Sequence, residues 1–130
     1  MPRILVIDDE RMVCETLAKI LERGGYESSC VDRAAVGIRL FREEPFDLVI
    51  TDIFLPDMDG LEVVRELHSE FPNTPIIAMS GGGEVLHEDF LPMARKIGAS
   101  HVMYKPFNAM ELLGTVNAVL EEKVARHSAA

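Results

Sequence analysis

The chain has 130 residues, of which 48% are hydrophobic and 27% charged, as expected for one compact domain with a buried core and not for a disordered chain. Acidic residues outnumber basic ones by 22 to 13, giving a net charge of −9, and this charge argues against binding to nucleic acids or anionic lipid. No leader and no apolar run of about 20 residues is evident, so we expect a cytoplasmic protein that does not enter a membrane.

Apolar runs of strand length alternate with segments of helical periodicity from the N-terminus onward. The first strand is predicted at residues 3–7, and the first helix at residues 10–23, with Asp9 as its N-cap. The second strand is predicted at residues 27–31. A second amphipathic helix follows, for which Asp32 is the predicted N-cap.

The same alternation continues through the middle of the chain. A third strand is predicted at residues 47–51, and a helix at about residues 59–71. A fourth strand at residues 75–79 precedes a helix at about residues 88–97. Pro92 is compatible with that helix only in its first turn, because a proline further inside removes a backbone hydrogen bond.

The last unit is a strand at residues 101–104 and a helix whose start is marked by Asn108 and Glu111, in a spacing similar to a capping box. We expect one domain at residues 1–122 and a frayed tail at residues 123–130. Five strand-then-helix units with Val-, Ile- and Leu-rich strands predict an α/β fold, in which five helices cover both faces of a doubly wound, five-stranded parallel sheet.

Polar side chains follow the predicted strands at the edge where such a sheet binds ligands. Taken singly, each fits a cap, a turn or a solvated surface position. Together they place three acids, a hydroxyl and an amine in one crevice. Carboxylates so close together repel each other unless a cation neutralises them, and an all-oxygen set suits Mg²⁺. The residues are Asp8, Asp9, Asp52, Ser80 and Lys105.

Asp52 is the candidate nucleophile of this group. With Mg²⁺ bound, a carboxylate can attack phosphorus and form an acyl phosphate, whose charge Lys105 and Ser80 would stabilise. The glycines at 81–83 have two open interpretations, backbone N–H groups that approach a phosphoryl oxygen or a flexible loop. They lack the Lys and Ser or Thr of a P-loop.

The motifs taken together resemble those of response regulator receiver domains from about residue 4 to residue 120. The resemblance implies a flavodoxin-like sheet of order 2-1-3-4-5, with Asp52 as phosphoacceptor and Ser80 and Lys105 as sensors of the phosphoryl group. It implies Mg²⁺ ligands at Asp8, Asp9 and Asp52 and at the Phe54 carbonyl oxygen. The matching segments are ILVIDDE (4–10), DLVITDIFLPDMDG (47–60), MSG (79–81), GA (98–99) and KPF (105–107).

The resemblance also implies the partners and the mode of action. The phosphoryl donor would be a sensor histidine kinase or a histidine phosphotransfer protein. A downstream protein target would bind the face made by the fourth helix, the fifth strand and the fifth helix. The net charge, independently of the resemblance, argues against nucleic acid and membrane as partners. We expect slow self-hydrolysis of the acyl phosphate but no enzyme activity. With no room for an effector module, a stand-alone receiver is expected.

Two details bear on how phosphorylation would change the affinity for partners. The resemblance implies a cis peptide bond between Lys105 and Pro106, the one kind of bond for which the cis form has a modest cost. Many relatives carry an aromatic residue where this chain has Val102. We hypothesise that Tyr104, on the same side of the strand, partly substitutes for it.

Other interpretations remain. An aspartyl-nucleophile phosphatase-like enzyme normally has a second Asp two residues after the nucleophile, where this chain has Phe54. A nucleotide- or flavin-binding module is disfavoured by the three acids at the expected phosphate site. Cys14 and Cys30 have no Cys-x-x-Cys spacing and no His cluster nearby, so we predict buried or half-buried thiols.

Overall fold

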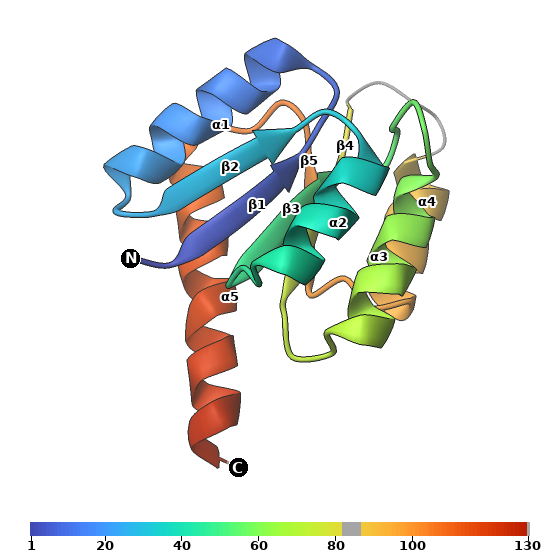
Figure 1. The fold of residues 1–130 in the computed structure, drawn as a ribbon. Helices are drawn as coiled ribbons and strands as arrows, with labels where there is room; N and C mark the ends of the chain where they lie inside the picture. The colour runs from blue at the N-terminus through green and yellow to red at the C-terminus, as the bar shows by residue number, and fades with distance from the viewer. Residues whose placement is uncertain (82–86, 130) are drawn as a thin grey trace.

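The computed structural model describes the backbone of residues 1–81 and 87–129, and the side chains of residues 1–81 and 92–122. Within these residues, five parallel strands form one sheet in the order β2-β1-β3-β4-β5, with helices on both faces (Figure 1). The predicted α/β fold and its strand order are confirmed. The strands are β1 (Arg3–Ile7), β2 (Glu27–Val31), β3 (Leu48–Asp52), β4 (Ile76–Ser80) and β5 (His101–Tyr104), and the helices are α1 (Arg11–Arg23), α2 (Ala34–Glu43), α3 (Gly60–Glu70), α4 (His87–Lys96) and α5 (Ala109–Ala129).

The sheet has a hydrophobic core on each face. Because successive side chains of a strand point to opposite faces, Leu5 and Ile7 of β1 pack with α2, α3 and α4, whereas Ile4 and Val6 pack with α1 and α5. In Figure 1, α1 and α5 accordingly lie on one side of the sheet and the other three helices on the other side. Burial on both faces explains why the central strands are almost entirely apolar.

The polar residues lie where the strands end. Asp52 and Ser80 are the last residues of β3 and β4, and Asp8 and Lys105 directly follow β1 and β5. Since β1, β3, β4 and β5 are successive neighbours in a parallel sheet, their carboxyl ends lie along one edge. The strand order therefore brings together residues from opposite ends of the chain.

The start of α1 differs from the prediction that Asp9 caps it. The N-cap of α1 is Glu10, and its side chain makes no capping hydrogen bond. Instead, the Glu10 N–H donates to Oδ1 of Asp8 at 2.9 Å. The turn is held by the first acid of the pair rather than the second, because the side chain of Asp8 reaches forward to the backbone two residues later.

The start of α2 also differs from the prediction, which named Asp32 as its cap. The N-cap position is occupied by Arg33, without a side-chain capping bond. The N–H groups of Ala34 and Ala35 donate to the carboxylate of Asp57, at 3.0 and 3.1 Å, and these hydrogen bonds hold the pKa of Asp57 below its usual value. A carboxylate from the β3–α3 loop thus stabilises the start of α2 across the molecule.

The last two helices show one confirmed and one wrong prediction. Asn108 Oδ1 accepts a hydrogen bond from the Glu111 N–H at 2.8 Å, as the capping pattern predicts. Pro92, however, lies inside α4 and not in its first turn. The helix α5 continues past residue 123, where we expected a tail, and the domain boundary there stays a prediction. In the described part of the chain, no helix has the length and apolar character of a membrane span.

Gly60, the first residue of α3, packs directly against the backbone that leaves β3. Its N–H donates to the Ile53 carbonyl oxygen at 2.8 Å. A Cβ added at Gly60 would lie 2.3 Å from both the Cα and the carbonyl oxygen of Ile53, and 2.6 Å from the carbonyl oxygen of Asp52. The absence of a side chain therefore lets α3 start against the backbone of the candidate nucleophile.

We predict that Gly60→Ala lowers the free energy of unfolding by about 1–3 kcal/mol, because rigid backbone atoms must move to admit the methyl group. Chemical denaturation followed by circular dichroism measures this change. Gly114→Ala in α5 is the matched control: a Cβ there meets nothing within 4 Å, so alanine should raise stability by up to about 1 kcal/mol. Equal stabilities of Gly60→Ala and the wild type would contradict the prediction.

Candidate functional site

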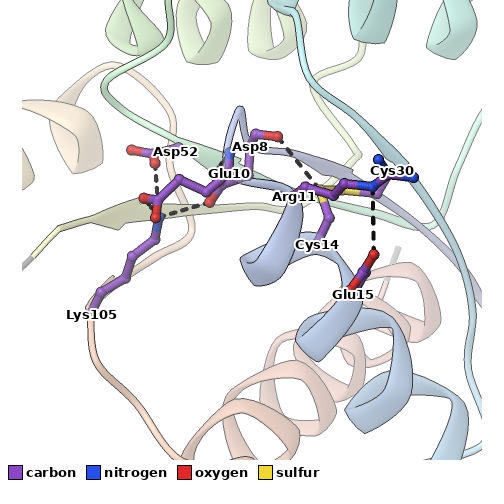
Figure 2. The surroundings of a disulfide bond; sticks show 8 residues. All are labelled: Asp8, Glu10, Arg11, Cys14, Glu15, Cys30, Asp52 and Lys105. Atoms are coloured by element: carbon purple, nitrogen blue, oxygen red, sulfur yellow. Dashed lines mark hydrogen bonds and ion pairs between the residues drawn. A yellow bond between two sulfur atoms is a disulfide. The ribbon is translucent and has the colours of Figure 1, made fainter.

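Four of the predicted site residues lie together at the carboxyl edge of the sheet. Asp8 and Ser80 are 0% exposed and Asp52 is 4% exposed, and the Lys105 side chain is 13% exposed. Figure 2 shows the side chains of Asp8, Asp52 and Lys105 pointing toward one another. The cluster of acids with one amine, inferred from the sequence, is thus present in the fold.

Lys105 is the centre of the cluster. Its Nζ donates to Oδ2 of Asp8 at 2.7 Å and to Oδ2 of Asp52 at 2.9 Å. It is also 3.7 Å from Oε1 of Glu10. Glu10 was not among the site residues predicted from the sequence, although it follows Asp8 and Asp9 directly in the loop after β1. Its position in that loop was the available signal.

Backbone hydrogen bonds hold the acids and the amine in place. Asp52 Oδ1 accepts a hydrogen bond from the Phe54 N–H at 2.9 Å, which fixes its orientation and leaves Oδ2 for Lys105. The Lys105 N–H donates to the Ser80 carbonyl oxygen at 2.8 Å and so connects the ends of β4 and β5. The bond from Lys105 to Pro106 is cis, as the resemblance implied.

The pKa values of the buried charged groups follow from this arrangement. Burial raises the pKa of the Asp8 carboxyl, and the hydrogen bond and charge of Lys105 only partly offset that effect. Burial alone would lower the pKa of Lys105, but its hydrogen bonds to Asp8 and Asp52 and their negative charges raise it overall. The raised pKa favours the protonated, positively charged form of Lys105.

The acids have the composition of a divalent cation site. One carboxylate oxygen each from Asp8, Glu10 and Asp52 lie within 4.8 Å of one another. Carboxylates without imidazole or thiolate ligands suit Mg²⁺ better than transition metals. Asp9 is not one of these three residues. It is exposed and lines an adjoining surface hollow. Its role as a ligand, and that of the Phe54 carbonyl oxygen, stay predictions.

Ser80 lies at the same edge of the sheet, beside the backbone of Lys105. It is the last residue of β4 and is fully buried, and its Oγ donates a long hydrogen bond of 3.5 Å to the Gly81 carbonyl oxygen. A Cβ added at Gly81 meets nothing within 4 Å, so close packing does not explain this glycine. The other two glycines of the run, 82 and 83, lie outside the described residues.

A disulfide bond adjoins the acidic cluster and contradicts the prediction of two thiols. Cys14 of α1 and Cys30 of β2 are bonded, with their Cα atoms 5.9 Å apart (Figure 2). Cys30 is paired in register with Val6 of β1, and α1 packs beside β2. The sequence separation of 16 residues gave no indication of this contact, which depends on how α1 lies against the sheet.

Comparison with known sequences agrees with this geometry. The family model for response regulator receiver domains matches residues 4–117. Response regulator protein FleR of Pseudomonas aeruginosa is 32% identical over 126 residues, which are 97% of this chain and 24% of FleR. The cell cycle transcriptional regulator CtrA of Caulobacter vibrioides is 32% identical over 118 residues, which are 91% of this chain and 50% of CtrA. The chain thus spans about a quarter of FleR and half of CtrA.

Solved structures show the same fold over almost the whole chain. A CheY-like receiver domain protein from Methanospirillum hungatei superposes with a TM-score of 0.89 at 29% identity, covering 97% of this chain and 98% of that one. A receiver domain protein from Clostridium thermocellum gives a TM-score of 0.88 at 31% identity, covering 96% and 98%. In these two cases the match includes nearly the full length of both chains.

Proposed function

We propose, since this chain belongs to the family of response regulator receiver domains, that it is a phosphorylatable switch in which Asp52 accepts the phosphoryl group. The observation that carries the proposal is the contact of one ammonium group with two acids. Lys105 Nζ donates hydrogen bonds to Asp8 at 2.7 Å and to Asp52 at 2.9 Å. The second of these bonds places a largely buried ammonium group beside the carboxylate of Asp52, where it can stabilise phosphoryl oxygens.

The proposed reaction transfers a phosphoryl group from a phosphohistidine of a sensor histidine kinase or a histidine phosphotransfer protein. A carboxylate oxygen of Asp52 attacks the phosphorus, the bond from phosphorus to the histidine nitrogen breaks, and an acyl phosphate forms. The hydrogen bond from the Phe54 N–H orients the attacking carboxylate. Lys105, which already contacts Asp52, supplies positive charge to the phosphoryl oxygens.

The proposed cofactor is Mg²⁺, held by Asp8, Asp9 and Asp52 and by the Phe54 carbonyl oxygen, with Glu10 beside them. When bound, Mg²⁺ neutralises the negative charge that develops on the transferring group. The fit rests on the donor set, because the clustered ligand atoms of the described residues are carboxylate oxygens. Transition metals generally prefer imidazole or thiolate ligands over such carboxylate oxygens.

The proposed switch runs from Ser80 and Lys105 to a protein target on α4, β5 and α5. The hydrogen bond from the Lys105 N–H to the Ser80 carbonyl oxygen couples the two residues that would sense the phosphoryl group. On β5, Val102 is half-buried and packs on the side of α2, α3 and α4, while Tyr104 is 48% exposed. The hypothesis that Tyr104 moves in place of an aromatic residue at 102 stays a prediction.

The chain acts at residues 1–122 as a cytoplasmic signalling domain, with slow self-hydrolysis of its acyl phosphate as its only turnover. Its net charge of −9 favours protein partners over nucleic acid or membrane. The output of any longer protein that contains such a domain depends on what else that protein carries.

The test is phosphorylation by a small donor. We expect acetyl phosphate with Mg²⁺ to add one phosphoryl mass to the intact protein, and we expect hydroxylamine, which cleaves acyl phosphates, to remove it. Chelation of Mg²⁺ with EDTA should prevent the adduct, because the repulsion between the acids and the incoming anion is then not offset. Intact-protein mass spectrometry measures both outcomes. An adduct that forms fully in EDTA, or that resists hydroxylamine, would refute the proposal.

A further inference from the structure

The disulfide lies beside the loop that carries Asp8 and is accessible from the surface. Cys14 is in the first turn of α1 and is half-buried, and Cys30 near the end of β2 is exposed. Both line a hollow of about 630 Å³ that Asp8 also lines, a size within the range of about 300–1,000 Å³ of small-molecule sites. A small reagent can therefore approach this disulfide from the surface.

The same disulfide holds the loop that carries the acids. Cys14 Sγ lies 3.5 Å from the Asp8 carbonyl oxygen, and the Cys14 N–H donates to the Glu10 carbonyl oxygen at 3.1 Å. The Asp8 N–H donates to the carbonyl oxygen of Val31, the residue after Cys30, at 3.0 Å. Residues 8–10 therefore contact both β2 and the start of α1, and the disulfide joins these two segments covalently.

We propose that Cys14 and Cys30 are a reversible redox-modification site, which exchanges with a neutral or cationic low-molecular-weight thiol–disulfide couple and whose oxidised form holds the acidic pocket in its cation-binding geometry. The second part of this proposal rests on the proposed function. Disulfides are rare in the cytoplasm and, where present in mesophiles, are usually transient. An exposed position is typical of disulfides that exchange readily.

The exchange is balanced in electrons and protons. In the oxidising direction, the thiolate of one cysteine attacks a sulfur of the small disulfide, forms a mixed disulfide and releases one small thiol. The thiolate of the other cysteine attacks the protein sulfur of that mixed disulfide and releases the second small thiol. Two electrons pass from the protein dithiol to the small disulfide, and the two protein thiol protons end on the two released thiols. Reduction is the reverse.

The charge around the hollow determines which small thiols react most readily with the disulfide. Acids on its wall outnumber the one basic residue, Arg11, whose Nε already lies 3.5 Å from an oxygen of Glu15. Such a surface repels anionic thiols and attracts cationic ones, and added salt screens both effects. The acids are Asp8, Asp9, Glu15 and Asp32.

The oxidation state would act on cation affinity through preorganisation. In the oxidised form, the start of α1 is joined covalently to β2, so the loop at residues 8–10 has less freedom to lose when a cation binds. In the reduced form, noncovalent contacts alone keep α1 in place. We expect about fivefold weaker Mg²⁺ binding after reduction, at the lower end of typical coupling between sites.

The first experiment measures exchange on the full chain. The protein is equilibrated in cystamine–cysteamine mixtures and quenched with N-ethylmaleimide, and mass spectrometry counts the maleimides added. We expect forms with none and with two to interconvert. Each rate of reduction is divided by the rate of the same thiol with a small uncharged disulfide, which removes differences in thiol pKa. At low salt, this ratio should be highest for cysteamine, lower for 2-mercaptoethanol and lowest for 3-mercaptopropionate, and the spread should narrow in 1 M salt, where charges are screened over about 3 Å. A disulfide that resists every mixture, thiols that never oxidise, or a highest rate ratio for the anionic thiol would overturn the proposal.

The second experiment measures Mg²⁺ affinity by calorimetry in the oxidised and the reduced protein. The double variant Cys14→Ser, Cys30→Ser is the control, which should bind like the reduced protein whatever the redox buffer. Equal affinities of the oxidised and reduced wild type would refute the coupling. Absence of an acetyl phosphate adduct in both redox states would contradict the proposed function alone, because thiol exchange and Mg²⁺ affinity are measured without phosphorylation.

Discussion

Asp52→Asn is expected to abolish the phosphoryl adduct, since the amide that replaces the carboxylate has no nucleophilic oxygen of comparable strength. The change is small in shape and keeps an oxygen that can accept the hydrogen bond from the Phe54 N–H, now 2.9 Å from Asp52 Oδ1. The fold should therefore persist. Intact-protein mass spectrometry after treatment with acetyl phosphate and Mg²⁺ measures the loss, and circular dichroism verifies that the variant is folded.

The control for this variant lies in the same loop. Asp57 follows β3 and is exposed, but its carboxylate bonds to the N–H groups of Ala34 and Ala35, away from the acidic pocket. Asp57→Asn should keep the adduct at the wild-type level. A full adduct on the Asp52→Asn protein would remove Asp52 as the acceptor. Loss of the adduct in both variants would point to a disturbed loop instead of a missing nucleophile.

Lys105→Met is expected to cost about 3–5 kcal/mol of unfolding free energy at neutral pH without Mg²⁺, because it leaves buried acids without their cation. The two acids that contact the ammonium group, Asp8 and Asp52, have side chains that are only 0% and 6% exposed. Methionine is similar in size to the lysine stem and should fill its space. Urea denaturation in EDTA measures the cost, and Mg²⁺ should recover part of it by replacing the lost charge.

The cost should depend on pH in a direction that the pKa of Asp8 determines. Burial already raises that pKa above 3.8, and the variant also loses the Lys105 contacts that lower it. A carboxyl group with a raised pKa in the folded state destabilises the protein above that pKa and stops doing so as the pH falls through it. The difference between variant and wild type should therefore shrink between neutral pH and about pH 4.

Two comparisons make the Lys105 prediction specific. Lys19→Met replaces an exposed lysine of α1 and should change stability by at most about 0.5 kcal/mol. In the wild type, the pKa of Lys105 is raised above 10.5, so its contribution is present below that pH and is lost only as the pH rises through the folded-state pKa. If Lys105→Met matched the wild type in EDTA at neutral pH, the buried charge pairs would have no net stabilising role.

The strands and the pocket were accessible from the sequence because their signals are local. A run such as residues 4–7 is apolar throughout and followed by acids, and an apolar run that leads to an acid returns at residues 48–52. Parallel pairing then brings the carboxyl ends of neighbouring strands together whatever the details of the loops. Asp8, Asp52, Ser80 and Lys105 could be assigned to one site for this reason.

The N-caps and the cysteines show where local patterns fail. Asp9 and Asp32 have the sequence positions of N-caps, yet Asp8 holds the turn before α1 and Asp57 caps α2. A capping hydrogen bond can be made by any carboxylate that reaches the helix start, so spacing alone does not identify it. The Cys14 to Cys30 bond likewise depends on the packing of α1 beside β2.

The sequence by itself determined the alternation of strands and helices, the parallel α/β architecture, and the chemistry available at the sheet edge. These follow from the periodicity of apolar residues and from the residue types at strand ends, which neighbouring positions encode. Only the tertiary structure decided that Glu10 lies beside Asp8 and Asp52, that Cys14 bonds to Cys30, and that Gly60 touches the backbone after Asp52. Each of these depends on the direction of a side chain or on a close approach between distant segments, and both are set by the packing of the whole domain.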